Sequence, residues 1–177
     1  MIATMKKIKK SISRRSFLQS SAGMGAGILL FPSVNPVTIQ NRSTGLRPLI
    51  ITSHTNETGH KAMELGWEVL TKGGSAVDAV ERAANTIELD PEDTSVGYGG
   101  LPNENGVVQL DASFMDGKTY SAGAVACLER IKTPASVARL VMQHTDHVLL
   151  TGQGALDFAK AWGFREEDLL TEKARKI

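Results

Sequence analysis

The hydrophobic residues change their spacing several times after position 48, and each change predicts an element. A short β-branched run at 49–52, bounded by a proline and a polar stretch, is typical of a buried strand. Apolar residues at helical spacing over 61–72 predict a helix, and the glycine pair at 73–74 predicts its end. The domain is therefore expected to open with a strand followed by a helix.

A second helix is predicted over 76–87. Ser75 stands at its start and Asp78 lies three residues on, which is the spacing of a capping box. The following segment, 92–106, holds four glycines, one proline and two asparagines. It is expected to be a loop whose backbone adopts unusual angles.

A hairpin is predicted next, because apolar runs at 107–115 and 120–127 flank Asp116-Gly117, a typical turn dipeptide. Thr133-Pro134 then has the residue types of a helix N-cap and first helical position.

The remaining pattern predicts a strand at 147–151, a short helix at 154–162 and one more helix from Arg165 onward. Neither a glycine cap nor a proline stop follows this last helix, so it is expected to continue past Ile177. Together the elements predict an α+β fold with antiparallel pairing, in a chain long enough for one domain with a core.

The first forty residues resemble a twin-arginine export signal. A lysine-rich start precedes Arg14-Arg15, Phe17-Leu18 follows, and 20–31 is mainly small and apolar. A membrane anchor would need about 20 predominantly apolar residues, which this stretch does not supply. We therefore expect 1–40 to be a signal and linker, 41–177 to belong to the domain, and the protein to be exported to the periplasm.

Charge and cysteine content argue against two kinds of chemistry. After Ser16 there are 14 basic and 19 acidic residues, a net charge of −5, so no basic face for nucleic acid is expected. Cys127 is the single cysteine, which excludes an intramolecular disulfide. Its apolar neighbours indicate a small core residue.

Several motifs follow one another in the order and spacing of a known family. They are KGGSAVDAV (72–80), DTSVGYGG (93–100), LDA (110–112), MDG (115–117), GAVAC (123–127), RIKTP (130–134), VAR (137–139) and HVLLTGQGA (147–155). In this order they resemble the α-subunit of the glycosylasparaginases, from about Ile50 to the C-terminus. Several ordered motifs are far more specific than one.

The resemblance implies the N-terminal part of an N-terminal-nucleophile amidohydrolase, with a four-layer αββα fold that is incomplete in this chain. Such a precursor cuts itself into two subunits and frees a threonine. The threonine hydroxyl attacks the side-chain amide of an N-glycosylated asparagine, with its own amine as base, and aspartate and a glycosylamine are released. No metal or organic cofactor is implied. The expected partners are the substrate, a C-terminal β-subunit and further copies in an oligomer.

The chain contains no His-Asp-Thr triplet, the context in which the family's nucleophile stands. The nucleophilic threonine is therefore expected in the missing β-subunit, and this truncated α-subunit portion is expected to be inactive alone. Asp93-Thr94-Ser95 superficially resembles the cleavage context. The Tyr98-Gly99-Gly100 that follows places it instead in the family's substrate-side loop.

Ser95 and Thr55 are the residues that the resemblance assigns to substrate binding. The matching serine of the family faces the aspartyl moiety, and the alternative for Ser95 is a turn serine that caps local amides. Many relatives carry a Ser-Thr-Trp-like segment where this chain has SHTNET at 53–58. The missing tryptophan weakens the implied preference for a glycosylated substrate. Trp67, on the first predicted helix, is interpreted as a core residue.

Two histidine pairs and one acid are candidates for other roles. His54 with His60, and His144 with His147, lack the spacing of a strong metal site, so no metal is expected. Asp111, inside a predicted strand, is interpreted as an acid that orders neighbouring backbone.

Two alternative functions remain open. The first is an L-asparaginase or isoaspartyl peptidase of the same superfamily. The second is a truncated, non-catalytic remnant, in which the hairpin's apolar surface lacks the strands that would cover it.

Overall fold

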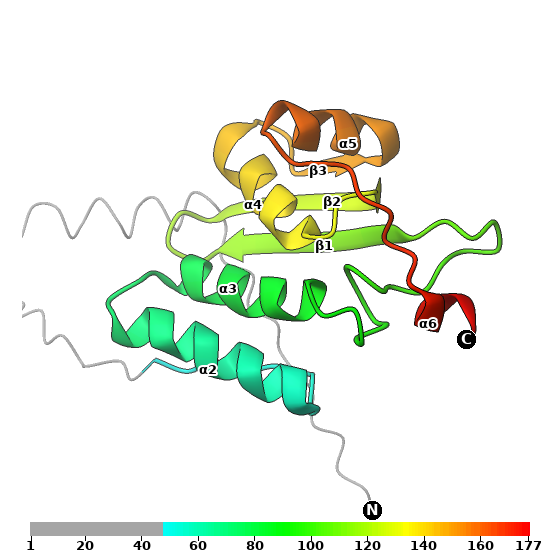
Figure 1. Ribbon diagram of the computed structural model, residues 1–177. Helices are drawn as coiled ribbons and strands as arrows, with labels where there is room; N and C mark the ends of the chain where they lie inside the picture. The colour runs from blue at the N-terminus through cyan, green and yellow to red at the C-terminus, as the bar shows by residue number, and fades with distance from the viewer. Residues whose placement is uncertain (1–47) are drawn as a thin grey trace, which may run out of the picture. The chain divides into compact units, whose positions relative to one another are not determined.

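The computed structural model describes residues 48–177, so the predicted export signal at 1–40 lies outside the described residues. Figure 1 shows the elements in chain order. They are α2 (Glu57–Thr71), α3 (Ala76–Glu88), β1 (Gln109–Asp116), β2 (Ser121–Glu129), α4 (Pro134–His144), β3 (Leu149–Thr151), α5 (Gly152–Ala161) and α6 (Glu172–Arg175). Within this part of the chain, no helix has the length and apolar character needed to cross a bilayer.

The first helix, α2, begins earlier than the predicted range of 61–72. Asn56 is its N-cap, and the Asn56 side-chain oxygen accepts a hydrogen bond from the backbone N–H of Gly59 at 2.8 Å. This cap satisfies one of the free amides of the first turn, which allows polar residues to form that turn ahead of the apolar stripe. The helix ends as predicted, before Gly73, whose φ of +83° suits glycine.

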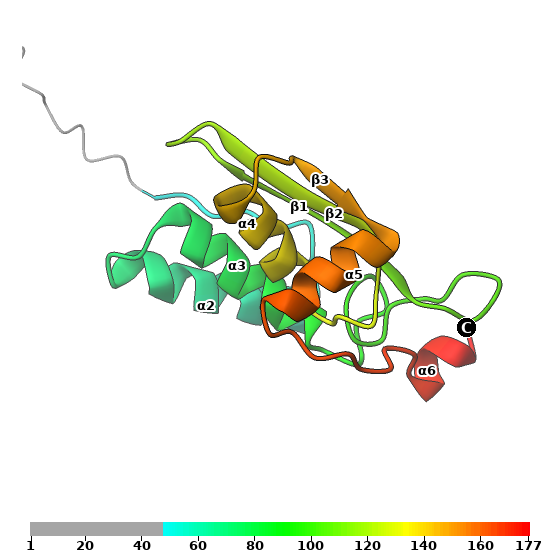
Figure 2. The same ribbon diagram turned by 90° about the horizontal axis from the view of Figure 1, so that it is seen from above.

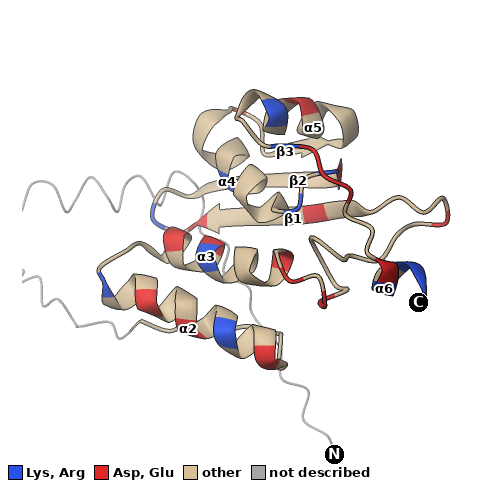
Figure 3. Ribbon diagram, viewed as in Figure 1, with Lys and Arg blue, Asp and Glu red and all other residues tan. Residues whose placement is uncertain are grey.

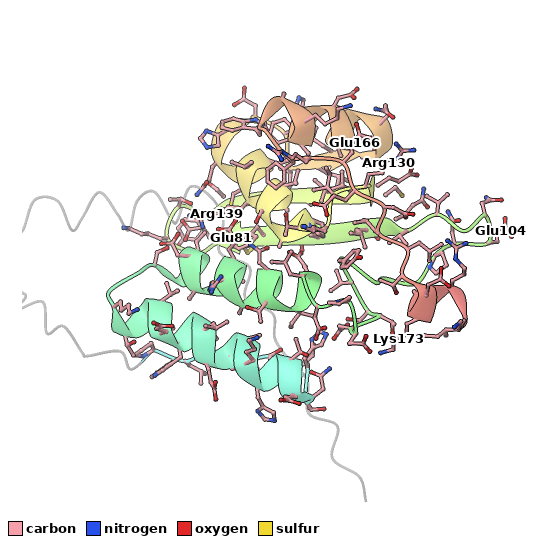
Figure 4. All side chains as sticks on the ribbon, in the orientation of Figure 1. Glu81, Glu104, Arg130, Arg139, Glu166 and Lys173 are labelled. Carbon is pink, nitrogen blue, oxygen red and sulfur yellow. The ribbon has the colours of Figure 1, made fainter. Side chains whose placement is uncertain are left out.

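The second helix, α3, confirms the predicted capping box. Ser75 Oγ accepts from the N–H of Asp78 at 3.1 Å, and the Asp78 carboxylate accepts from the N–H of Ser75 at 3.2 Å. Arg139 of α4 then links α4 to α3. Its guanidinium donates to Asp78 at 2.6 Å and also to Glu81, and Figure 4 shows Arg139 and Glu81 pointing toward one another.

The sheet has the order β1-β2-β3 and is mixed, so the expectation of antiparallel pairing is only partly correct. The predicted hairpin is confirmed, because β1 and β2 pair antiparallel. The short strand β3 pairs with β2 in parallel. The reason is the connection: helix α4 carries the chain across the sheet before β3 begins, as parallel neighbours require.

Helices cover one face of this sheet. Figure 2 shows α4 and α5 on the same face, and the largest core cluster joins them to the strands. Its fully buried members include Val125 and Leu128 of β2 and Val137 and Val141 of α4. At Gly123 a Cβ would lie 2.3 Å from a backbone nitrogen of α4, so only glycine allows this close approach. No helix within residues 48–177 covers the opposite face.

Two predicted elements are wrong. No strand forms at 49–52, where Ile50 packs on α2 but Ile51 is 80% exposed. A strand needs a partner for its backbone, and none of the described strands pairs with this segment. The helix predicted from Arg165 is instead extended chain, with only four helical residues in α6. The apolar residues of this extended segment pack against the hairpin, because Leu169 is buried in a small cluster with Val108 and Leu110.

Cys127 and Trp67, both predicted for the core, lie at the surface. The interpretation of Asp111 as an acid that orders neighbouring backbone is confirmed. Cys127 is exposed, with a φ of +51°, because the β1–β2 register shifts beside it and the bulge turns its side chain outward. Asp111 orders this bulge, accepting a hydrogen bond from the N–H of Cys127 at 2.7 Å. Trp67 is 41% exposed on α2, so its periodicity placed it at the edge of the buried stripe.

Glu88 is a buried carboxylate at the C-terminal end of α3 and is only 3% exposed. Its Oε1 accepts a hydrogen bond from the N–H of Ala135 at 2.8 Å, in the first turn of α4. Thr133 and Pro134 occupy the predicted N-cap and first helical positions, but the Thr133 side chain makes no capping bond. Glu88 caps α4 in its place. Burial raises the pKa of Glu88 to about 7, although the bond from Ala135 opposes this rise.

This pKa predicts that Glu88 makes stability depend on pH. Between about 4.5 and about 7 the folded protein retains a proton that the unfolded chain has released. The free energy of unfolding should therefore fall as pH rises through this window, by on the order of 3 kcal/mol for this group. Glu88→Gln keeps an acceptor for Ala135 and cannot ionise, so it should remove that fall.

Urea denaturation of the wild-type and variant chains at pH values from 4.5 to 8 measures the effect. Glu104→Gln, at an exposed loop carboxylate, is the matched control. Equal pH slopes for the wild type and Glu88→Gln would show that the buried carboxylate does not titrate in this range.

Candidate functional site

The glycine-rich loop 93–100 is fixed against the end of α3. The N–H of Tyr98 donates to the backbone carbonyl of Glu88 at 2.7 Å. Gly97 has a φ of +70°, and a Cβ there would lie 2.1 Å from the same carbonyl oxygen. Only glycine fits at this position, for both reasons. The expectation of a loop with unusual backbone angles is thus confirmed.

Asp93 and Ser95 form the polar part of this loop. The Asp93 side chain is 4% exposed. Its Oδ1 accepts from the N–H of Ser95 at 2.9 Å and also from the Ser95 hydroxyl. Burial alone would raise the pKa of Asp93, but the hydrogen bonds from Ser95 and from the Asn56 side chain, together with nearby His54, outweigh it and hold the pKa below its usual value. Asp93 is therefore an ionised carboxylate at neutral pH.

His54 reaches this cluster from the segment before α2. Its Nε2 lies 3.1 Å from Ser95 Oγ and 3.6 Å from Asp93 Oδ2, and its side chain is 26% exposed. Gly59 of α2 fixes the position of His54, because a Cβ on Gly59 would lie 2.3 Å from the His54 carbonyl oxygen. Two segments 41 residues apart thus meet at the Ser95 hydroxyl.

The site residues predicted from the sequence differ in their surroundings. Ser95 is exposed, and its contacts with Asp93 are those of a turn serine, so the alternative role describes part of its environment. Thr55 is also exposed and follows His54 directly. Thr94 lies within the loop, where its carbonyl accepts from the N–H of Leu101 at 3.2 Å. Substrate contact by Ser95 and Thr55 stays a prediction.

The sequence interpretation missed His54 as a member of this cluster. In the sequence, His54 pairs only with His60 as a weak metal-site candidate, and His60 is exposed on α2. No spacing rule connects His54 with Ser95. The one sequence signal for His54 is its place in segment 53–58, which lacks the expected tryptophan. Within residues 48–177, no group of three His, Cys, Asp or Glu side chains is arranged to hold a metal ion. His144 instead stacks on Trp162, with ring centroids 4.4 Å apart.

A separate hollow of about 500 Å³ lies on the hairpin side of the described unit. Its wall includes Arg130 and Glu166, which form an ion pair at 3.2 Å and lie close together in Figure 4. Lys132 and Glu167 pair nearby at 2.8 Å. Figure 3 shows a similar mixture of positive and negative positions along α2 and α3. Arg130, the one basic residue in the wall, is paired with an acid of the same wall, so this hollow is a weaker candidate for substrate binding than the cluster around the exposed residue Ser95.

Comparisons with known proteins cover nearly all of the described residues. The model of the Asparaginase family matches residues 48–176. The N(4)-(β-N-acetylglucosaminyl)-L-asparaginase of Elizabethkingia miricola is 43% identical over 93% of this chain and 48% of its own length. The human isoaspartyl peptidase/L-asparaginase is 50% identical over 66% of this chain and 38% of its own length. The chain thus spans about half the length of these relatives or less.

Proposed function

Because the chain belongs to the Asparaginase family, we propose that it forms the N-terminal portion of an autoprocessed amidohydrolase for N-glycosylated asparagine. The reaction cleaves the side-chain amide and releases aspartate and a glycosylamine. The observation that carries this proposal is the extent of the matches. Relatives named N(4)-(β-N-acetylglucosaminyl)-L-asparaginase, from Elizabethkingia miricola, rat and mouse, match over 93%, 84% and 66% of the chain. The match to the human isoaspartyl peptidase covers 66%.

In this proposal the described residues supply half of the scaffold and one wall of the substrate site. The loop 93–100 is the substrate-side loop, with Ser95 and Thr55 as contacts for the aspartyl moiety. The nucleophilic threonine belongs to the C-terminal portion, where its own amine acts as base and an oxyanion hole stabilises the tetrahedral stages. The face of the β1-β2-β3 sheet that no described helix covers supports a further sheet packed there, as an αββα fold requires.

A second candidate is an isoaspartyl peptidase or L-asparaginase. Two observations favour it: the human protein of that name is 50% identical to this chain over 119 residues, and segment 53–58 holds no tryptophan. His54 stands beside Ser95 there instead, so this part of the proposed substrate site is polar. Pocket walls decide which analogue is accepted, so this difference bears on the substrate more than on the chemistry.

A precursor that joins this chain to the C-terminal portion should hydrolyse N-acetylglucosaminyl-asparagine with a higher kcat/KM than a β-aspartyl dipeptide. Release of aspartate from both substrates measures the preference. The chain alone is the control and should show no turnover, because it carries no His-Asp-Thr nucleophile. A higher kcat/KM for the dipeptide would assign the protein to the second candidate. Turnover by the chain alone would contradict the proposed place of the nucleophile.

We also propose export of the folded protein through the twin-arginine pathway, from the order of residues around Arg14-Arg15. Replacing both arginines by lysine keeps the charge and should abolish the appearance of the protein in the periplasmic fraction. The matched control replaces Lys9 and Lys10 by arginine, which leaves the arginine pair intact and should leave export unchanged. Undiminished export of the Arg14→Lys, Arg15→Lys variant would contradict the proposal.

A further inference from the structure

The hydrogen bonds of Ser95 can be assigned one proton at a time. A serine hydroxyl has one proton to donate and two lone pairs that accept. Ser95 Oγ lies within hydrogen-bond distance of Asp93 Oδ1, and Asp93 is ionised. An ionised carboxylate has no proton, so the Ser95 hydroxyl must donate to it. The single proton of the Ser95 hydroxyl is therefore donated to Asp93.

The same reasoning shows which ring nitrogen of His54 carries a proton. Its Nε2 lies 3.1 Å from Ser95 Oγ, which has already donated its proton. If Nε2 carried a lone pair, it would face a lone pair of the hydroxyl, with the Asp93 carboxylate 3.6 Å away. Both contacts become favourable when Nε2 carries the proton. His54 therefore donates to Ser95, and one lone pair of the hydroxyl remains free.

We propose that His54 is a positioning residue that holds the Ser95 hydroxyl as a hydrogen-bond acceptor toward the substrate. The inference rests on the function proposed above, in which Ser95 contacts the aspartyl moiety. A hydroxyl held from both sides in this way cannot rotate to donate. The substrate group that meets it must bring an N–H or O–H, and a carboxylate oxygen is excluded.

The surroundings of His54 suit such a role. Gly59 leaves no room for the His54 backbone to move toward α2, and the backbone N–H of His54 donates to Thr52 Oγ1 at 3.1 Å. The side chain of His54 is only 26% exposed, while Ser95 is exposed. The negative charge of Asp93 lies behind the hydroxyl. This charge favours a cationic donor, such as the free amino group of an aspartyl amide, over an anionic group.

Kinetics of the complete precursor test the proposal through a double-mutant cycle. His54→Leu removes the donor and should raise KM about three- to tenfold, the worth of one hydrogen bond, with a smaller change in kcat. His54→Gln places an amide N–H near the same point and should restore most of the loss. In the Ser95→Ala background, His54→Leu should change KM less than twofold. His60→Leu, at an exposed histidine of α2, is the matched control and should leave KM unchanged.

Equal effects of His54→Leu with and without Ser95 would overturn the proposal, because His54 would then act independently of the hydroxyl. So would a His54→Gln variant as impaired as His54→Leu.

A second measurement does not depend on activity. Nitrogen-15 NMR of the histidine-labelled precursor should show the proton on Nε2 of His54, with a signal that moves in Ser95→Ala. A bare Nε2 would overturn the proposal even in an active enzyme. The expected spectrum in a protein that cleaves no aspartyl amide would sink the proposed function and leave the His54–Ser95 geometry standing.

Discussion

The burial of one carboxylate, that of Glu88, constrains most of the described structure. Its side chain caps α4 through the N–H of Ala135, and its backbone carbonyl holds the N–H of Tyr98 in the glycine-rich loop. A carboxylate out of water is costly, and the first turn of a helix is one of the few places where that cost is partly offset. Because Glu88 is the last residue of α3, the cap and the loop anchor form at one point. The end of α3, the start of α4 and the loop are therefore placed together.

The candidate site follows from that constraint and from a second one at the start of α2. Gly97 lets the loop pass directly over Glu88, which brings Asp93 and Ser95 to the end of α3. On the other side, Gly59 lets the backbone of His54 pack on α2. Two glycines thus allow two backbone segments to approach closely, and the polar side chains meet between them. A side chain at either glycine would separate the groups by moving backbone, which no rotamer change could compensate.

The sequence predicts well what depends on neighbours along the chain. The capping box of Ser75, the loop, the hairpin and the position of Pro134 all follow from local rules and are confirmed. Ser95 was also placed correctly in that loop.

The predictions that are wrong concern features that depend on residues far away along the chain. The run at 49–52 has strand composition, but the described residues offer it no pairing strand. Cys127 has apolar neighbours, but a register shift against β1 turns it outward. The parallel placement of β3 requires knowledge of where α4 crosses the sheet. His54 was missed for the same reason, since its role exists only once Ser95 lies beside it.

We propose that the loop anchored at Glu88 presents Ser95 to the substrate, with His54 and Asp93 beside its hydroxyl. The decisive experiment is a crystal structure of the complete protein with its proposed product, aspartate, bound. An aspartate nitrogen is expected within hydrogen-bond distance of Ser95 Oγ, while His54 Nε2 keeps its contact with the same oxygen. Aspartate bound away from the loop, or with a carboxylate oxygen against Ser95, would contradict it.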